Sequence, residues 1–367
     1  MSAMRKNSRF LVWAGLLAAA ILLLSSPAWA LRFVFYADSR GDSEDPFVNE
    51  QVLNLINQKI LKLRPRPELV IFGGDMAYRG GKAKFERWKT VMTTLTDQGI
   101  GLYIAIGNHE LYKDNPTDSA LKNQEDFQQV FNFLPEGGPN AHYDRLAYSF
   151  ESLDGDSLFA VLATWYVDPV TKEEYSGKLT QAQLTWVARE LAESRATHKF
   201  VITHRPVFGM GGGAPESTLQ ELWQIMDDNR VDIFFCGHEH LYSRKTIDSK
   251  VDPNYRNNVV QVMAGSCGAP LAVRDGIKVN MRQWHVNLNY NFSVVDVSGC
   301  KVAVNSYGLK YTEFPVIAPK WRFFPIDKFR RNTVDCPPRT SWWPRFLPQL
   351  MPEYLSYNVT PRVFKDP

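Results

Sequence analysis

The stretch from residue 31 to residue 110 alternates between short apolar runs and helix-like segments, and this alternation constrains the fold more than any other feature. The runs "LRFVFYAD" (31–38), "ELVIFGGD" (68–75) and "IGLYIAIGNHE" (100–110) are rich in β-branched and aromatic residues and end in Gly, Asp or Asn. Apolar residues at helical spacing separate them at 46–63 and 84–99. A strand–helix–strand–helix–strand order predicts parallel pairing with helical crossovers.

Beyond residue 110 the sequence predicts a second set of strands. Helices are expected near 120–133 and over 180–194, where Thr180 is a good cap. The strand-like runs are 146–153, 157–166, 199–204, 231–236 and several more after 258. We therefore expect a mixed α/β fold, a four-layer α/β/β/α sandwich of two mixed β-sheets with flanking helices, whose metal site lies at the strand carboxyl ends.

Residues 1–30 have the features of a secretory signal peptide. Arg5, Lys6 and Arg9 precede an apolar stretch over 10–24, and Ala28-Trp29-Ala30 follows it. We expect cleavage after Ala30 and a periplasmic or secreted protein; the alternative is an uncleaved N-terminal anchor. Three of the 42 basic residues lie in this segment, which leaves 39 against 39 acidic residues. That balance gives no support for nucleic-acid binding.

We expect the remaining chain to consist of one large domain over 31–319, which carries the predicted site, and a C-terminal extension over 320–367. The extension is rich in proline, aromatic and basic residues. Its proline spacing over 341–355 excludes a regular helix or central strand there. It is either an extended tail packed on the domain or an arm that contacts a membrane surface or a protein partner.

Four cysteines allow three full disulfide pairings in an exported protein. Cys236 lies in the apolar run "VDIFFC", which predicts a buried thiol. Cys300 with Cys336 is the preferred bridge. No C-x-x-C spacing indicates a structural zinc site.

Polar side chains follow the carboxyl ends of five predicted strands, at positions that we call corners. One such residue alone is most often a helix cap or a polar group with an ordinary hydrogen-bond partner, but polar residues at five equivalent corners are hard to explain by packing. Oxygen and nitrogen ligands without thiolate suit Fe, Mn or Zn rather than calcium, and a carboxylate such as Asp75 can bridge two metal ions. The corners are Asp38, Asp75, Asn108-His109-Glu110, His204 and His238-Glu239-His240.

The motifs "GGD", "GNHE", "VITH" and "GHEH" resemble those of the calcineurin-like metallophosphoesterases, over about residues 31–310. That family usually begins with Asp-x-His, whereas this chain has "ADSRG" with Arg40 at the histidine position. The purple acid phosphatase branch lacks that histidine and has a tyrosine three residues after the bridging aspartate. The pair Asp75 and Tyr78 in "GDMAY" is similar to that pattern.

This resemblance implies two metal ions, iron together with zinc, manganese or a second iron. One ion would be held by Asp38, Asp75, Tyr78 and His240, and the other by Asp75, Asn108, His204 and His238. The alternative for Tyr78 is a ring that packs beside the site.

The other polar residues of the corners receive roles from their chemistry. His109 can supply a proton to a leaving alkoxide, and Glu110 would orient His109 or raise its pKa. Glu239 is expected to point away from the site. Arg40 and Arg205 can contact a phosphate through paired hydrogen bonds; for Arg40 the alternative is an ion pair with an acidic neighbour, Asp42 or Glu44.

The sequence thus predicts an exported, metal-dependent phosphoester hydrolase that acts on a small-molecule phosphoester. Its expected form is an acid phosphatase-like phosphomonoesterase, with a metal-bridging hydroxide as nucleophile and His109 as proton donor. The alternatives are a phosphodiesterase or nucleotidase on the same site, and a non-catalytic protein that binds metal or phosphate.

Overall fold

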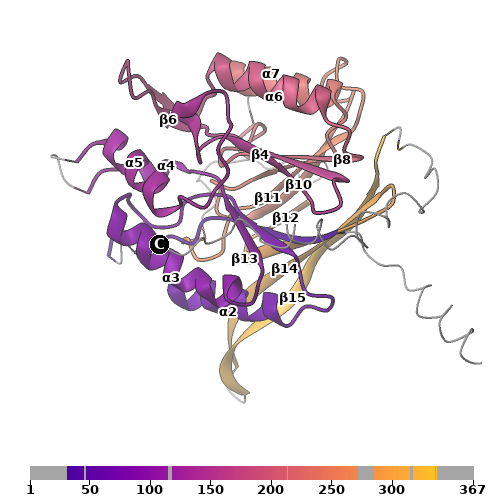
Figure 1. The fold of residues 1–367 in the computed structure, drawn as a ribbon. Helices are drawn as coiled ribbons and strands as arrows, with labels where there is room; N and C mark the ends of the chain where they lie inside the picture. Colours follow the sequence, from indigo (N-terminus) through magenta and orange to yellow (C-terminus); the bar gives the residue numbers. More distant parts are fainter. Residues whose placement is uncertain are drawn as a thin grey trace, which may run out of the picture.

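The computed structural model describes residues 31–44, 47–114, 118–212, 214–271, 285–314, 317–334 and 336. Two large sheets pack face to face and helices cover their outer faces (Figure 1). The strand orders are β15-β14-β13-β1-β2-β3 in the six-stranded sheet and β12-β10-β11-β9-β8-β5-β4 in the seven-stranded sheet. The mixed α/β sandwich expected from the sequence is confirmed.

The six-stranded sheet contains the first three predicted strands as parallel neighbours, β1 to β2 to β3. The remaining strands of this sheet run antiparallel, from β13 beside β1 to β15 at the edge. The bounds are β1 (Leu31–Tyr36), β2 (Leu69–Phe72), β3 (Gly101–Ile104), β13 (Tyr290–Ser298), β14 (Lys301–Phe314) and β15 (Ile317–Asn332).

The seven-stranded sheet has a parallel centre, in which β5, β8, β9 and β11 follow one another. Antiparallel strands flank this centre. A separate hairpin, β6 (Trp165–Val167) with β7 (Glu174–Ser176), lies outside both sheets. The bounds are β4 (Tyr148–Glu151), β5 (Ser157–Val161), β8 (His198–Ile202), β9 (Ile233–Cys236), β10 (Tyr242–Ile247), β11 (Val259–Ala264) and β12 (His285–Asn287).

Helices cover the outer face of each sheet, as Figure 1 shows for α2 and α3 on one side and for α6 and α7 on the other. The expected cap of α6 is present, because the Thr180 side chain accepts a hydrogen bond from the Gln183 amide. The bounds are α2 (Glu50–Leu61), α3 (Lys82–Thr96), α4 (Asn108–Leu111), α5 (Ala120–Val130), α6 (Gln181–Glu193) and α7 (Ser217–Asp228), with one 3-10 turn, η1 (Ala141–Tyr143).

Aromatic side chains fill the space between the two sheets. The Phe33 ring of β1 lies 5.1 Å from Phe159 of β5, 5.2 Å from Phe200 of β8 and 5.8 Å from Phe235 of β9, centroid to centroid. All four side chains are fully buried. Burying a phenylalanine of this kind contributes about 1.5–3 kcal/mol. This contact sets the distance between β1 and the parallel centre of the other sheet.

The C-terminal strand β15 crosses the expected domain boundary between residues 319 and 320. Its residues pair with β14 from Thr312–Lys320 to Lys301–Asn332, and Trp321 and Phe329 pack against the core. A register shift between Ser306 and Tyr307 puts these two rings on opposite faces of the sheet, because Trp321 pairs with Tyr311 and Phe329 pairs with Val304. Residues 320–332 are therefore part of the sheet. Residues 1–30 and 337–367 lie outside the described residues.

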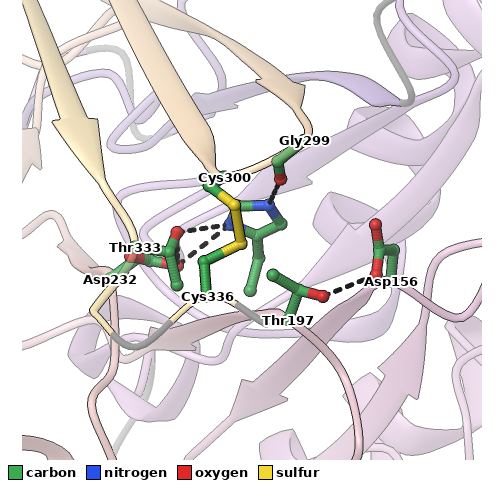
Figure 2. The surroundings of a disulfide bond; sticks show 8 residues. Asp156, Thr197, Asp232, Gly299, Cys300, Thr333 and Cys336 are labelled. Carbon is green, nitrogen blue, oxygen red and sulfur yellow. Dashed lines mark hydrogen bonds and ion pairs between the residues drawn. A yellow bond between two sulfur atoms is a disulfide. The ribbon is translucent and has the colours of Figure 1, made fainter. Parts of the chain in front are cut away.

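A disulfide links Cys300 to Cys336, so the predicted pairing is confirmed (Figure 2). The predicted buried thiol at Cys236 is also confirmed. Next to Cys300 in the chain, the Gly299 carbonyl oxygen lies 2.7 Å from His198 Nε2, and His198 Nδ1 lies 3.1 Å from Asp232 Oδ2. Among the described residues, no helix has the length and hydropathy needed to cross a membrane.

Candidate metal centre

Five strand ends meet at one edge of the sandwich. The loops after β1 and β2 carry Asp38 and Asp75, and Asn108 begins α4 shortly after β3. The loops after β8 and β9 carry His204 and His238. A hydrogen bond crosses between the sheets here, since the His238 amide donates to Asp38 Oδ2 at 3.0 Å. The predicted corners therefore lie together, as expected for ligands at the carboxyl ends of parallel strands.

One group of candidate ligands consists of Asp75, His204 and His238, whose ligand atoms lie within 4.8 Å of one another. Asn108 completes it, because its Oδ1 is 3.1 Å from His204 Nε2 and 3.0 Å from His238 Nδ1. His204 Nδ1 lies 2.7 Å from the Gly73 carbonyl and donates its hydrogen there. Nε2 of His204 therefore faces the oxygen atoms of Asp75 and Asn108, at 3.2 and 3.1 Å, which is the direction in which a metal ligand would point.

The second group consists of Asp38, Asp75 and His240, within the same 4.8 Å limit. His240 Nε2 lies 3.6 Å from Asp38 Oδ1, while its Nδ1 faces the Pro270 carbonyl at 2.8 Å. Again a backbone carbonyl fixes the tautomer and leaves one nitrogen free. Asp75 belongs to both groups, which is the position of a carboxylate that bridges two ions.

The backbone at these ligands adopts a sparsely populated conformation. Asp38, Asp75 and His238 have φ angles of 61°, 58° and 75°. A non-glycine residue in this left-handed region costs about 1–2 kcal/mol. Nearby glycines make the close approach possible, because a Cβ on Gly107 would collide with the Asp75 carboxylate and one on Gly237 with the Asp38 carboxylate. Such strain is concentrated at functional sites.

The carboxylates Asp75 and Asp38 attract positive charge at the centre. Burial lowers the pKa of His204, but these two carboxylates outweigh burial and raise this pKa to about 9. Burial lowers the pKa of His238 to about 3, with a further contribution from His204. Burial and the nearby Arg40 lower the pKa of His240 to about 4. Burial raises the pKa of Asp38 well above its usual range, because its ionised form lacks solvent. Deprotonated nitrogen and carboxylate oxygen donors without sulfur fit iron, zinc or manganese ions.

His109 lies at the edge of this centre, with an exposed side-chain fraction of 11%. Its Nδ1 is 2.5 Å from the Tyr78 carbonyl oxygen, and its Nε2 is 3.8 Å from Asp75 Oδ2. The carbonyl accepts a hydrogen bond from Nδ1–H. Nε2 is therefore the nitrogen that faces the ligands and can exchange a proton there. Burial lowers the pKa of His109, although Asp75 partly opposes this effect.

Glu110 does not orient His109, so that expectation is wrong. Its side chain is fully buried and accepts three backbone hydrogen bonds: Oε2 from Asp75 and Gly107 at 2.9 and 2.7 Å, and Oε1 from Met76 at 2.7 Å. Adjacent residues of a helix point in different directions, which separates Glu110 from His109. Glu110 therefore positions the loop of Asp75 and does not reach a substrate. Glu239 points away from the ligands as expected and accepts from the Met210 amide.

Tyr78 and Arg40 lie against each other beside the centre. The Arg40 guanidinium is 5.3 Å from the centroid of the Tyr78 ring, and the His109 ring is 5.4 Å from it. Arg40 Nη1 donates to the Gly41 carbonyl at 2.9 Å, whereas its buried Nε has no hydrogen-bond partner. Within the described part of the chain, Arg40 forms no ion pair with its acidic neighbours, so the salt-bridge alternative is not supported.

The guanidinium of Arg205 donates a hydrogen bond from Nη1 to the Gly177 carbonyl oxygen. It lies near enough to His238 to contribute to the low pKa of that imidazole. One neighbour of the ligands was not predicted from the sequence: the ring centroid of Trp165 is 5.0 Å from that of His238 and 5.4 Å from that of His204. Residues 157–166 were expected to form one strand, but β5 ends at Val161 and a turn redirects the chain. No signal in the apolar run marks that break.

The sequence profile of the calcineurin-like phosphoesterases matches residues 32–242, more than half of the chain. The chain belongs to this family. Human tartrate-resistant acid phosphatase type 5 is 24% identical over 251 residues, which cover 62% of this chain and 74% of that protein. Arabidopsis thaliana purple acid phosphatase 23 is 26% identical over 209 residues, 48% of this chain and 42% of that protein.

Solved structures show the same fold. The purple acid phosphatase PPD1 from yellow lupin (Lupinus luteus) aligns with a TM-score of 0.60 at 17% identity, over 85% of this chain and 57% of that one. A structure of PhoD aligns with a TM-score of 0.57 at 12% identity, over 83% of this chain and 70% of that one. The calcineurin-like phosphoesterase described here is thus a hydrolase of the phosphoester class, related to the purple acid phosphatases, and its candidate ligands form two groups.

Proposed function

We propose that this phosphoesterase is an exported phosphomonoesterase that acts with two metal ions on small-molecule phosphoesters. The observation that carries the proposal is the pair of ligand groups that share Asp75, with His109 Nε2 3.8 Å from that carboxylate. The likeness to acid phosphatases over most of the human relative supports a phosphomonoester as substrate. Iron paired with zinc, manganese or a second iron suits the mixed oxygen and nitrogen ligands.

Bound ions would be held by Asp38, Asp75 and His240 on one side and by Asp75, Asn108, His204 and His238 on the other. Such ions would neutralise charge on the phosphate and would activate a water molecule for attack on phosphorus. Tyr78 is proposed as a further oxygen ligand on the side of Asp38.

The chain's own residues account for the remaining requirements of the reaction. Arg40 offers an unpartnered buried Nε beside the ligands, which suits a hydrogen bond to a phosphate oxygen. Arg205 adds positive charge on the side of His238. His109 holds a proton on Nε2 and gives it to the leaving alkoxide oxygen. Glu110 keeps Asp75 in its strained conformation through three backbone hydrogen bonds.

The experiment that tests this function combines metal analysis of the purified protein with a panel of phosphomonoesters and phosphodiesters. We expect about two metal ions per chain and turnover of monoesters. Asp75→Asn should lose both ions and the activity together, because it removes the carboxylate shared by the two groups. Metal binding without hydrolysis of any ester would refute the proposed enzymatic activity. A preference for diesters would show that the protein is a phosphodiesterase and not a phosphomonoesterase.

Export is a separate part of the proposal and rests on the basic, apolar and Ala-x-Ala order of residues 1–30. Mass measurement of the protein recovered outside the cytoplasm tests it. We expect a chain that begins at Leu31. A mature form that retains Met1 would show that the segment is an anchor.

A further inference from the structure

A pocket of about 290 Å³ opens beside Asn108, at the edge of the candidate metal centre. One wall consists of Leu111 and Tyr112, which follow Asn108 in and after α4. The opposite wall is the β6–β7 hairpin, with Trp165 and Val167. Because the oxygen of Asn108 belongs to one of the ligand groups, the pocket begins where a bound phosphate would sit.

Two aromatic side chains lie where the pocket meets the reacting groups. Trp165 has its ring centroid 5.0 Å from that of His238, a candidate ligand. Tyr112 has its ring centroid 4.7 Å from that of His109, the proposed proton donor. Tyr112 keeps an exposed fraction of 47%, although it lies beside buried ligands. The two rings therefore stand on either side of the path that the alcohol part of a substrate takes away from phosphorus.

The hairpin register turns Trp165 toward the centre rather than into the core. Trp165 pairs with Ser176, and Tyr166 pairs with Tyr175. Paired residues share one face of an antiparallel ribbon, and neighbours along a strand point to opposite faces. Tyr166 stacks on Tyr143 at 4.4 Å, so that face packs against the domain. The face of Trp165 is left for the ligand histidines and the pocket.

We propose that this pocket selects phosphomonoesters whose alcohol portion carries a planar aromatic ring, with Trp165 and Tyr112 as the residues that determine this specificity. The inference rests on the phosphomonoesterase activity proposed above. Proton transfer from His109 Nε2 fixes the ester oxygen next to Tyr112, so the organic group extends between the two rings. Leu111 and Val167 add apolar contacts to an aromatic ring, and Arg79, Lys113 and Glu174 contribute charged groups to the same lining.

The size of the pocket limits what it can hold. Pockets for drug-sized ligands measure about 300–1,000 Å³, so this one takes a single ring system rather than an oligonucleotide or a protein segment. Stacking on aromatic side chains changes affinity by up to about tenfold, which corresponds to 1.4 kcal/mol.

The test compares two esters that differ only in the ring, phenethyl phosphate and cyclohexylethyl phosphate. Both release a primary alkoxide, so they need protonation by His109 equally. We expect the metal-loaded protein to favour the phenyl ester in kcat/KM by about tenfold, mainly through KM. Trp165→Leu should bring the ratio close to one, while Trp165→Phe should retain most of it. The ratio cancels any loss of metal, because both esters suffer from it alike.

Tyr112→Ala provides a second variant, which removes an exposed side chain and keeps the hairpin intact. It should lower the phenyl preference, whereas Tyr311→Ala should leave it unchanged, since Tyr311 is equally exposed at 48% and lies outside the pocket. Equal kcat/KM values for the two esters in the unmodified protein would overturn the pocket assignment and leave the hydrolase standing.

Failure of the hydrolase itself can be told apart from failure of the pocket. If the metal-loaded protein hydrolyses no ester, calorimetric titration with phenethylphosphonate and cyclohexylethylphosphonate replaces the kinetic ratio. Tighter binding of the phenyl compound that disappears in Trp165→Leu would support the pocket without the activity. Equal affinities for the two phosphonates would overturn the pocket as well.

Discussion

Replacement of Glu110 by glutamine tests whether this residue acts on the backbone of Asp75 or on His109. The carboxylate accepts three backbone hydrogen bonds with full burial, two at Oε2 and one at Oε1. A glutamine can keep the two bonds at one oxygen, but its amide then points two donors at the Met76 N–H. Burial and Asp75 raise the pKa of Glu110 to about 7, so the side chain is a charged acceptor above that pH. There a lost hydrogen bond to it costs about 1.5–3 kcal/mol, and the buried donors are left unsatisfied. We therefore expect Glu110→Gln to lower the free energy of unfolding by about 2–3 kcal/mol.

The same substitution should weaken metal binding, because the bond to the Asp75 amide helps hold that residue at a φ of 58°. Urea unfolding at constant pH and metal analysis after dialysis measure the two effects. Glu216→Gln is the matched control, since Glu216 also accepts backbone hydrogen bonds but caps α7 away from the ligands. It should cost about 1 kcal/mol or less and leave the metal content intact.

The kinetic readout decides between the two roles of Glu110. If Glu110 positions Asp75, kcat in Glu110→Gln falls with the metal content and the pH profile keeps its shape. A variant that keeps its stability and metals while the pH profile of kcat shifts would contradict the positioning role of Glu110. Such a shift would show that Glu110 sets the pKa of His109, as expected from the sequence.

Four further substitutions separate the roles of residues in and beyond the centre. His109→Ala should keep both metals and slow esters of poor alkoxide leaving groups more than aryl esters, whereas His204→Ala should lose a metal; equal metal loss in both variants contradicts the proton-donor role. Tyr78→Phe should bleach the visible absorption of iron-loaded protein if the phenolate is a ligand, and unchanged absorption, metal content and rate would show that the ring only packs there. Burial lowers the pKa of His198, but Asp232 and the Gly299 carbonyl outweigh this effect and raise it. The stabilisation from His198 should therefore be complete below about pH 6.5 and lost as pH rises through the raised pKa. Urea unfolding at several pH values should show this loss in the unmodified protein and not in His198→Gln, and parallel curves would contradict it.

The positions of the candidate ligands could be predicted because each follows directly from local sequence. Asp75 comes after four buried residues and two glycines, and His204 ends the run "KFVITH". The carboxyl end of each strand can therefore be recognised in the sequence. Parallel pairing then brings the ends to one edge. The contacts of Arg40 could not be predicted in this way, because the choice between an acidic neighbour and the site depends on the turn that follows β1.

Other features depended on tertiary contacts that the sequence does not display. Glu110 was assigned to His109 because the two are adjacent, but its partners are the amides of Asp75, Met76 and Gly107, which the fold brings together. Trp165 lies in an apolar run with no Gly or Pro to mark the break before it. In β15, tertiary pairing with β14 overrides the prolines at positions 319 and 325, since an edge strand tolerates them.

The division of ligands between the sheets explains why the sequence could predict the ligands but not the distance between those of one sheet and those of the other. The oxygen ligands Asp38, Asp75 and Asn108 follow strands of the six-stranded sheet, and the nitrogen ligands His204 and His238 follow strands of the seven-stranded sheet. The strand pairing within each sheet fixes the relative positions of the ligands in one set. The distance between the two sets depends on how the sheets pack against each other. The aromatic contacts between β1 and β5, β8 and β9 fix that distance beneath the site. A core substitution that lets the sheets shift should therefore move every oxygen ligand relative to every nitrogen ligand at once. Metal affinity in this fold is thus a property of the interface between the sheets as well as of the ligands themselves.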